Sequence, residues 1–143
     1  MVMGLSRLSN DINKIARLMS DSDPSIHYDQ RVFRVRQNTE NGEVGAETYF
    51  RYEQTEDRLT GTYAGGTIAE GHLMGRVFPD GHLEFCYHHV TTDAHVRAGQ
   101  CTSTPHRDED DRLVLKEKWQ WFTGDQSHGT SELIEVDRDE VPD

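Results

Sequence analysis

The sequence lacks the long apolar run of a transmembrane helix and the apolar core of a signal peptide. No stretch of about 18 apolar residues occurs, and residues 1–20 carry charges throughout. We therefore expect a cytoplasmic protein that does not enter a membrane, with its thiols reduced. The two cysteines, Cys86 and Cys101, show neither zinc spacing nor a C-x-x-C pattern. We expect both to be buried and unreactive, with a cross-strand disulfide as the alternative.

Excess positive charge and the common catalytic motifs are also missing. The formal net charge is −11, and a surface of that sign repels phosphate backbones, which disfavours nucleic-acid binding. The chain contains no G-x-G-x-x-G, no P-loop lysine motif, no G-x-S-x-G and no H-E-x-x-H. Its eight histidines form no convergent triplet in the sequence pattern. We therefore expect neither a metal nor a cofactor.

One helical pattern is present, within an extension formed by residues 1–29. Leu5, Leu8 and Ile12 recur at spacings of three and four, which predicts a helix over Gly4–Ser20. Pro24 then forces the chain out of helical geometry. Three interpretations of this helix stay open: an arm packed on the outside of the domain, a lid over a barrel mouth, or a contact in a homodimer.

From Gln30 the apolar pattern changes to a period of two, and turn signals recur at short intervals. Eight antiparallel strands with short connections form a meander, which closes into an up-and-down barrel and leaves no exposed edge. The sequence therefore predicts an all-β, eight-stranded antiparallel up-and-down barrel over residues 30–137, with a flattened sandwich as the alternative. Residues 138–143 form an acidic tail. The expected strands are 31–37, 47–54, 58–64, 67–78, 82–91, 95–104, 112–121 and 130–136.

The turns suggest which side chains share the barrel interior. Two-residue turns at Asp80-Gly81 and at Asp93-Ala94 would place Gly75 opposite Cys86, and Cys86 opposite Cys101. A slip of one residue in either turn would exchange the two faces of a strand. With these turns, the predicted interior face contains Leu73, Gly75, Val77, Glu84, Cys86, His88, Gly99, Cys101 and Ser103.

Glu117 is the most informative single residue. It alternates with Leu115, Trp119 and Trp121, so the carboxyl group points inward if the tryptophans do. A buried carboxyl must be hydrogen-bonded or protonated, and its pKa can rise far enough for acid–base work near neutral pH. A purely structural carboxylate held by polar partners is the alternative. Lys116, on the opposite face, is expected to be solvated.

A ligand inside the barrel would be a small apolar or aromatic molecule, because the expected walls are aromatic. Glu117 is the candidate acid or base, and His88 is a second catalytic candidate, with Cys101 beside it as an alternative nucleophile. Tyrosine and tryptophan offer an apolar body with a polar tip. The candidate ligand-binding residues are Tyr52, Tyr63, Cys101, Ser103, Trp119 and Trp121.

Four segments resemble a family of small bacterial proteins that are often labelled "N-acetylglutamate synthase". They are NTENGEV (Asn38–Val44), YAGGTIAEGHLMG (Tyr63–Gly75), CTSTP (Cys101–Pro105) and EKWQWFTGDQSHGTS (Glu117–Ser131). The resemblance implies a small barrel of the avidin or lipocalin kind. The label itself conflicts with the residues, because acetyl-CoA-dependent transferases need a glycine-rich loop that opens a helix and binds pyrophosphate, and the sequence supplies none.

Two functions from different classes follow. The first is a binding module that holds one small molecule in the barrel. The second is a cofactor-independent cyclase or isomerase that shapes a flexible, natural-product-like substrate, with Glu117 as proton carrier and the Gly4–Ser20 helix as lid. A barrel filled by its own side chains, which acts through its surface, is a third interpretation.

Overall fold

The computed structural model describes residues 26–142, and eight strands account for most of them. The helix predicted over Gly4–Ser20 lies outside the described residues. Most of the strands alternate between buried and more exposed side chains, as expected for a sheet with one wet face. The strands are β1 (Val32–Asn38), β2 (Tyr49–Thr55), β3 (Arg58–Gly65), β4 (Ile68–Val77), β5 (Leu83–Thr91), β6 (Val96–Arg107), β7 (Leu113–Trp121) and β8 (His128–Val136).

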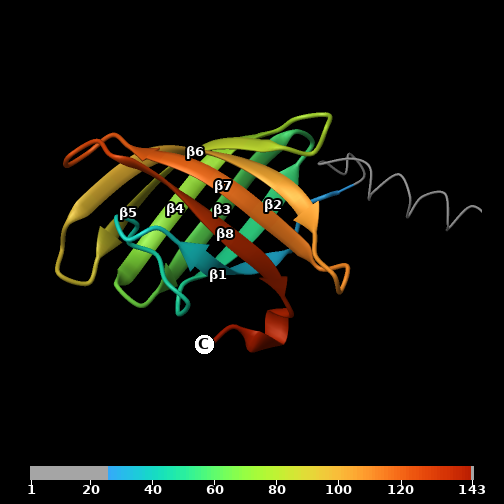
Figure 1. The fold of residues 1–143 in the computed structure, drawn as a ribbon, viewed down its shortest axis with the longest axis horizontal. Helices are drawn as coiled ribbons and strands as arrows, with labels where there is room; N and C mark the ends of the chain where they lie inside the picture. The colour runs from blue at the N-terminus through green and yellow to red at the C-terminus, as the bar shows by residue number, and fades with distance from the viewer. Residues whose placement is uncertain (1–25, 143) are drawn as a thin grey trace, which may run out of the picture.

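The strands form a closed antiparallel barrel in sequence order (Figure 1). Closure comes from the pairing of β1 with β8, in which Val32 lies opposite Val136. The predicted up-and-down barrel is therefore confirmed, and the flattened sandwich is wrong. Closure gives the backbone groups of the first and last strands partners in each other and removes the exposed edges.

The pairing of β1 with β2 is the shortest in the barrel. It spans three residue pairs, from Val32↔Arg51 to Arg34↔Tyr49. Beyond it the chain leaves the sheet as a loop of residues 39–48, which we call the mouth loop. This loop lies at the same end of the barrel as the β5–β6 and β7–β8 turns (Figure 1). That end is the mouth of the barrel.

The predicted register of β5 is wrong by one residue on both sides. Phe85, not Cys86, lies opposite both Gly75 and Cys101. Each turn has three residues instead of two and ends in a left-handed residue, Gly81 (φ 93°) or Ala94 (φ 69°). Because both turns shift the pairing by one residue, β4 and β6 keep their predicted inward faces, and only the inward and outward faces of β5 are exchanged. Three members of the predicted interior face, Glu84, Cys86 and His88, are therefore exposed on the outside.

The end opposite the mouth is closed by apolar side chains. Tyr28, which precedes β1, is fully buried in the core, and its hydroxyl donates to the carbonyl oxygen of Gly81 at 2.6 Å. Ile26 belongs to the same core, so the barrel's packing begins a few residues before the predicted boundary at Gln30. After β8, the predicted acidic tail contains a short 3-10 helix, η1 (Arg138–Glu140).

Candidate functional site

The inner face of β7 runs from the closed end of the barrel to its mouth. Leu113 and Leu115 are fully buried near the closed end, and Trp119 and Trp121 lie toward the mouth. Glu117 sits between these two pairs and is 7% exposed. The alternation of β7 therefore places one carboxyl group inside the barrel, where the apolar core meets the aromatic walls.

Hydrogen bonding to Glu117 is incomplete. Ser131 on β8 donates from Oγ to Glu117 Oε1 at 3.0 Å. Ser103 lies opposite Glu117 in the β6–β7 pairing, and Cys101 is its neighbour on the same face of β6. Burial raises the pKa of Glu117 to about 7, while the hydrogen bond from Ser131 and the nearby side chains of Cys101 and Ser103, which do not reach hydrogen-bond geometry, offset part of that rise. Near neutral pH the group is thus divided between its acid and carboxylate forms.

Three buried polar atoms in this region have no hydrogen-bond partner among the described residues. They are Glu117 Oε2, Ser103 Oγ and the hydroxyl oxygen of Tyr52. Burial, followed by the charge of Glu117, raises the pKa of Tyr52 well above its usual value, so this hydroxyl stays protonated. An unpaired polar group in an interior is costly. Such a set indicates a place where a further polar group can bind.

Aromatic side chains surround the space above Glu117. Phe50 stacks on Tyr63 with ring centroids 4.8 Å apart. Trp121 lies 5.6 Å from Trp119 and meets the ring of Tyr87 edge to face. These rings enclose about 50 Å³ of free space, which also touches the carboxyl group of Glu117. The pocket is compact, well below the roughly 300 Å³ at which drug-sized sites begin.

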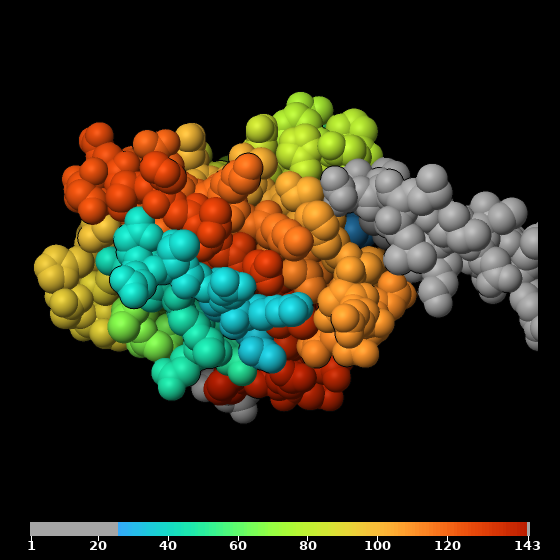
Figure 2. All heavy atoms as spheres, viewed as in Figure 1, coloured from blue at the N-terminus to red at the C-terminus, as the bar shows by residue number. Residues whose placement is uncertain are grey.

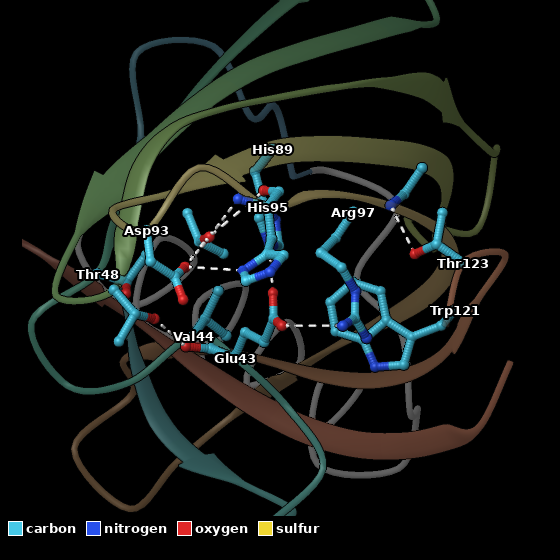
Figure 3. Close-up of polar contacts among 12 residues, drawn as sticks. Glu43, Val44, Thr48, His89, Asp93, His95, Arg97, Trp121 and Thr123 are labelled. Atoms are coloured by element: carbon cyan, nitrogen blue, oxygen red, sulfur yellow. Dashed lines mark hydrogen bonds and ion pairs between the residues drawn. The ribbon is translucent and has the colours of Figure 1, made fainter. Parts of the chain in front are cut away.

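Glu43, on the mouth loop, reaches across the mouth of the barrel. Its Oε1 lies 2.7 Å from Nε2 of the buried His89, whose Nδ1 lies 2.8 Å from the hydroxyl of Tyr63. Its Oε2 lies 3.4 Å from Nη1 of Arg97 on β6. The guanidinium of Arg97 in turn stacks over Trp121 at 4.7 Å (Figure 3). The loop carboxylate is therefore fixed between two basic side chains from neighbouring strands.

Further hydrogen bonds hold the mouth loop against the barrel. Trp121 Nε1 donates to the carbonyl oxygen of Asn41 at 3.2 Å. The amide of Asn41 donates to Ser127 Oγ and to the carbonyl oxygen of His128, so the loop packs on the β7–β8 turn (Figure 2). On the other side, Thr67 Oγ1 donates to the carbonyl oxygen of Glu43. The loop thus covers the pocket and is tied to three sides of the mouth.

Comparison with known proteins places this architecture in a family. Residues 26–136 match the family model described as avidin-like protein. The chain belongs to the avidin-like family. No curated protein and no solved structure gives a match. The matched range of this avidin-like chain begins at Ile26 and ends at Val136. It therefore includes the whole barrel and the buried residues Ile26 and Tyr28 that precede β1 at the closed end.

The avidin-like barrel brings seven of the eight predicted site residues to its interior. His88 is the exception, because the shifted register of β5 places it on the exposed outer face, stacked on His72 at 5.8 Å. Its neighbour His89 points inward and is 2% exposed. Both cysteines are free, and Cys86 is exposed, so the prediction of two buried thiols is wrong. The interior residues are Glu117, Tyr52, Tyr63, Cys101, Ser103, Trp119 and Trp121.

Other features of the site were missing from the sequence prediction. Glu43 and Arg97 come from segments that showed no site pattern, and only their ion pair in the fold joins them. Among the described residues, no group of three or more histidine, cysteine or acidic side chains is arranged to hold a metal ion. No helix in that part of the chain has the length and apolar character needed to cross a bilayer.

Proposed function

We propose that this avidin-like protein binds one small molecule in the pocket between Glu117 and the mouth loop. The observation that carries the proposal is the unpartnered Oε2 of Glu117, a residue that lines the pocket together with aromatic side chains. The other two unpartnered atoms, at Ser103 and Tyr52, are buried in the same interior but belong to residues outside the pocket lining. A ligand with a polar group could pair with the Glu117 oxygen, and its apolar or aromatic body could pack against the aromatic walls. The compact free space limits the bound part of that ligand to a few heavy atoms unless the mouth loop moves.

Tryptophan fluorescence tests this function directly, because the chain's two tryptophans both line the pocket. A fragment library titrated against the protein should yield compounds that change the emission saturably and raise the melting temperature, since ligands that bind the native state stabilise it. Trp119→Phe should reduce the emission change, while replacing the exposed Phe122 with leucine should leave it intact. A library that alters neither emission nor melting temperature would count against a binding function.

A cofactor-independent cyclase or isomerase is the second candidate, and the raised pKa of Glu117 favours it. A carboxyl group with a pKa of about 7 inside an aromatic pocket can deliver and recover a proton at physiological pH. Glu117 would be the proton carrier, and the pocket walls would orient a flexible substrate. Glu117→Gln should then abolish turnover of a bound substrate while binding persists. Equal rates for wild type and variant would remove the acid–base role.

A further inference from the structure

The charges that face the pocket are unbalanced toward the negative. Glu117 forms part of its inner wall and Glu43 part of its cover, and no lysine or arginine lines it among the described residues. The basic side chain that does line it, His89, is paired with Glu43 and with the hydroxyl of Tyr63. The nearest guanidinium, that of Arg97, is already paired with Glu43 and stacked on Trp121. A carboxylate or phosphate ligand would therefore meet a buried carboxyl group with no free cation beside it, which is electrostatically costly.

The walls of the pocket suit a positive charge. Aromatic rings carry a negative face, and a cation within about 6 Å of the ring centroid is attracted to it. The barrel already shows this contact at its rim, where the Arg97 guanidinium lies 4.7 Å from the ring of Trp121. Inside, rings from β2, β3, β5 and β7 converge on the space that also touches Glu117. Aromatic walls with a carboxylate at one side form a site for an organic ammonium group.

The unpartnered oxygen of Glu117 selects among such cations. Oε2 is an acceptor without a donor among the described residues, whereas Oε1 already accepts from Ser131. An ammonium N–H would donate to Oε2 in a charge-assisted hydrogen bond, which is stronger than a neutral one. A quaternary ammonium has no N–H and would leave this acceptor unpaired.

We infer that the pocket takes a protonated alkylamine, with the ammonium group against Glu117 and the alkyl chain among the aromatic rings. This inference rests on the proposed binding function and narrows it to one ligand class. The compact free space fits a short, unbranched amine or the amine end of a longer molecule whose remainder passes the mouth loop.

Three probes of matched size separate the charge of the ligand from its shape: propylammonium, propan-1-ol and propionate. Each is titrated near pH 8, where Glu117 is largely ionised, and the two indole N–H resonances report binding in ¹H–¹⁵N spectra. We expect propylammonium to bind at least about tenfold more tightly than propan-1-ol. Propionate should not bind.

Glu117→Gln keeps the shape of the side chain and removes its charge, so it should lower the affinity for propylammonium to that for propan-1-ol. Glu84→Gln makes the same change in net charge on the exposed face of β5 and should keep the preference. If propan-1-ol binds as tightly as propylammonium, the amine inference is wrong while the binding function stands. If no probe shifts either resonance, the amine class is also excluded, and the fragment library alone decides the binding function.

A second measurement covers the case in which Glu117→Gln does not fold. In the wild type, affinity for propylammonium should rise about fivefold or more from about pH 6 to about pH 8, as Glu117 loses its proton. Cys101 and Tyr52, which also face Glu117, have raised pKa values and stay neutral over this range. A parallel rise for propan-1-ol would overturn the inference. His89 is the basic side chain that lines the pocket, so loss of the rise in His89→Gln would overturn it as well.

Discussion

Replacing Glu117 with glutamine should change how the stability of the barrel depends on pH. Burial raises the pKa of this carboxyl group from 4.5 to about 7 in the folded chain. Below about pH 4.5 the group is protonated in both the folded and unfolded states, and it does not oppose folding. As pH rises toward 7, the unfolded state releases its proton first, so the free energy of unfolding falls. Above about pH 7 the loss is complete.

The size of this loss follows from the two pKa values. Each pKa unit corresponds to about 1.4 kcal/mol, so the rise from 4.5 to about 7 corresponds to roughly 3 kcal/mol. Glutamine has nearly the same shape, can still accept from Ser131 and does not ionise. The free energy of unfolding of Glu117→Gln, taken relative to that of the wild type, should therefore increase by roughly 3 kcal/mol from about pH 4 to about pH 8.

Urea unfolding of both proteins at these two pH values measures that gain. At each pH the free energy of unfolding of the wild type is subtracted from that of the variant. The change in this value between the two pH values isolates Glu117, because the titrations of other groups cancel. With slopes of about 1–3 kcal/mol/M, the gain corresponds to a shift of the unfolding midpoint of about 1–3 M. Glu84→Gln is the matched control, because this exposed carboxylate should give a pH-dependent difference near zero. A gain for Glu117→Gln below about 1 kcal/mol would refute the argument that burial of the carboxyl group opposes folding.

Three further predictions concern the rest of the fold. A thiol reagent should modify the exposed Cys86 at once and the buried Cys101 only after unfolding, with a count of one thiol per native chain; two fast thiols would contradict the packing. Glu43→Gln removes the ion pair with Arg97 and the carboxylate that faces His89, so hydrogen exchange in that loop should accelerate about fivefold, consistent with roughly 1 kcal/mol; unchanged exchange would mean that these contacts do not hold it. Gly99→Ala should cost about 1–3 kcal/mol in urea unfolding, because a Cβ there would overlap the carbonyl oxygen of Gln120. Gly45→Ala has open space around the new methyl group and serves as its control.

The sequence predicted the barrel because the period-two pattern and the turn signals are local. The inward alternation of β7 needed no knowledge of other strands, and it placed Glu117 and both tryptophans correctly inside. The order of the strands followed from short connections, since neighbouring segments joined by tight turns pair with each other.

The register of β5 depended on features that the turn sequences did not reveal. The segment Pro79-Asp80-Gly81 suggests a two-residue turn by its sequence, but it forms a three-residue turn, and this one-residue difference reverses the faces of the strand. The alternation within β5 indicates the observed register, because Leu83, Phe85 and Tyr87 form its apolar face. That pattern should outweigh turn length, since burial of a whole apolar face involves more free energy than the choice between two turn types.

The mouth of the barrel was beyond prediction for a different reason. Glu43 and Arg97 are 54 positions apart in the sequence, and their pairing depends on a loop whose path is set by scattered polar contacts. Such contacts leave no periodic signal. Loops that cover a site therefore remain the least predictable part of a barrel whose strands can be read locally.

The location of Glu117 also indicates that the two ends of the barrel have different roles. Five leucines, at positions 59, 83, 113, 115 and 133, have no exposed surface, and burial of each contributes about 1.5–3 kcal/mol. Their sum exceeds the roughly 3 kcal/mol by which ionised Glu117 opposes folding. An apolar side chain of similar size would fill the same place without that cost. The carboxyl group is therefore better explained by the proposed binding function than by a contribution to stability, and it lies where the packed core meets the free space of the pocket.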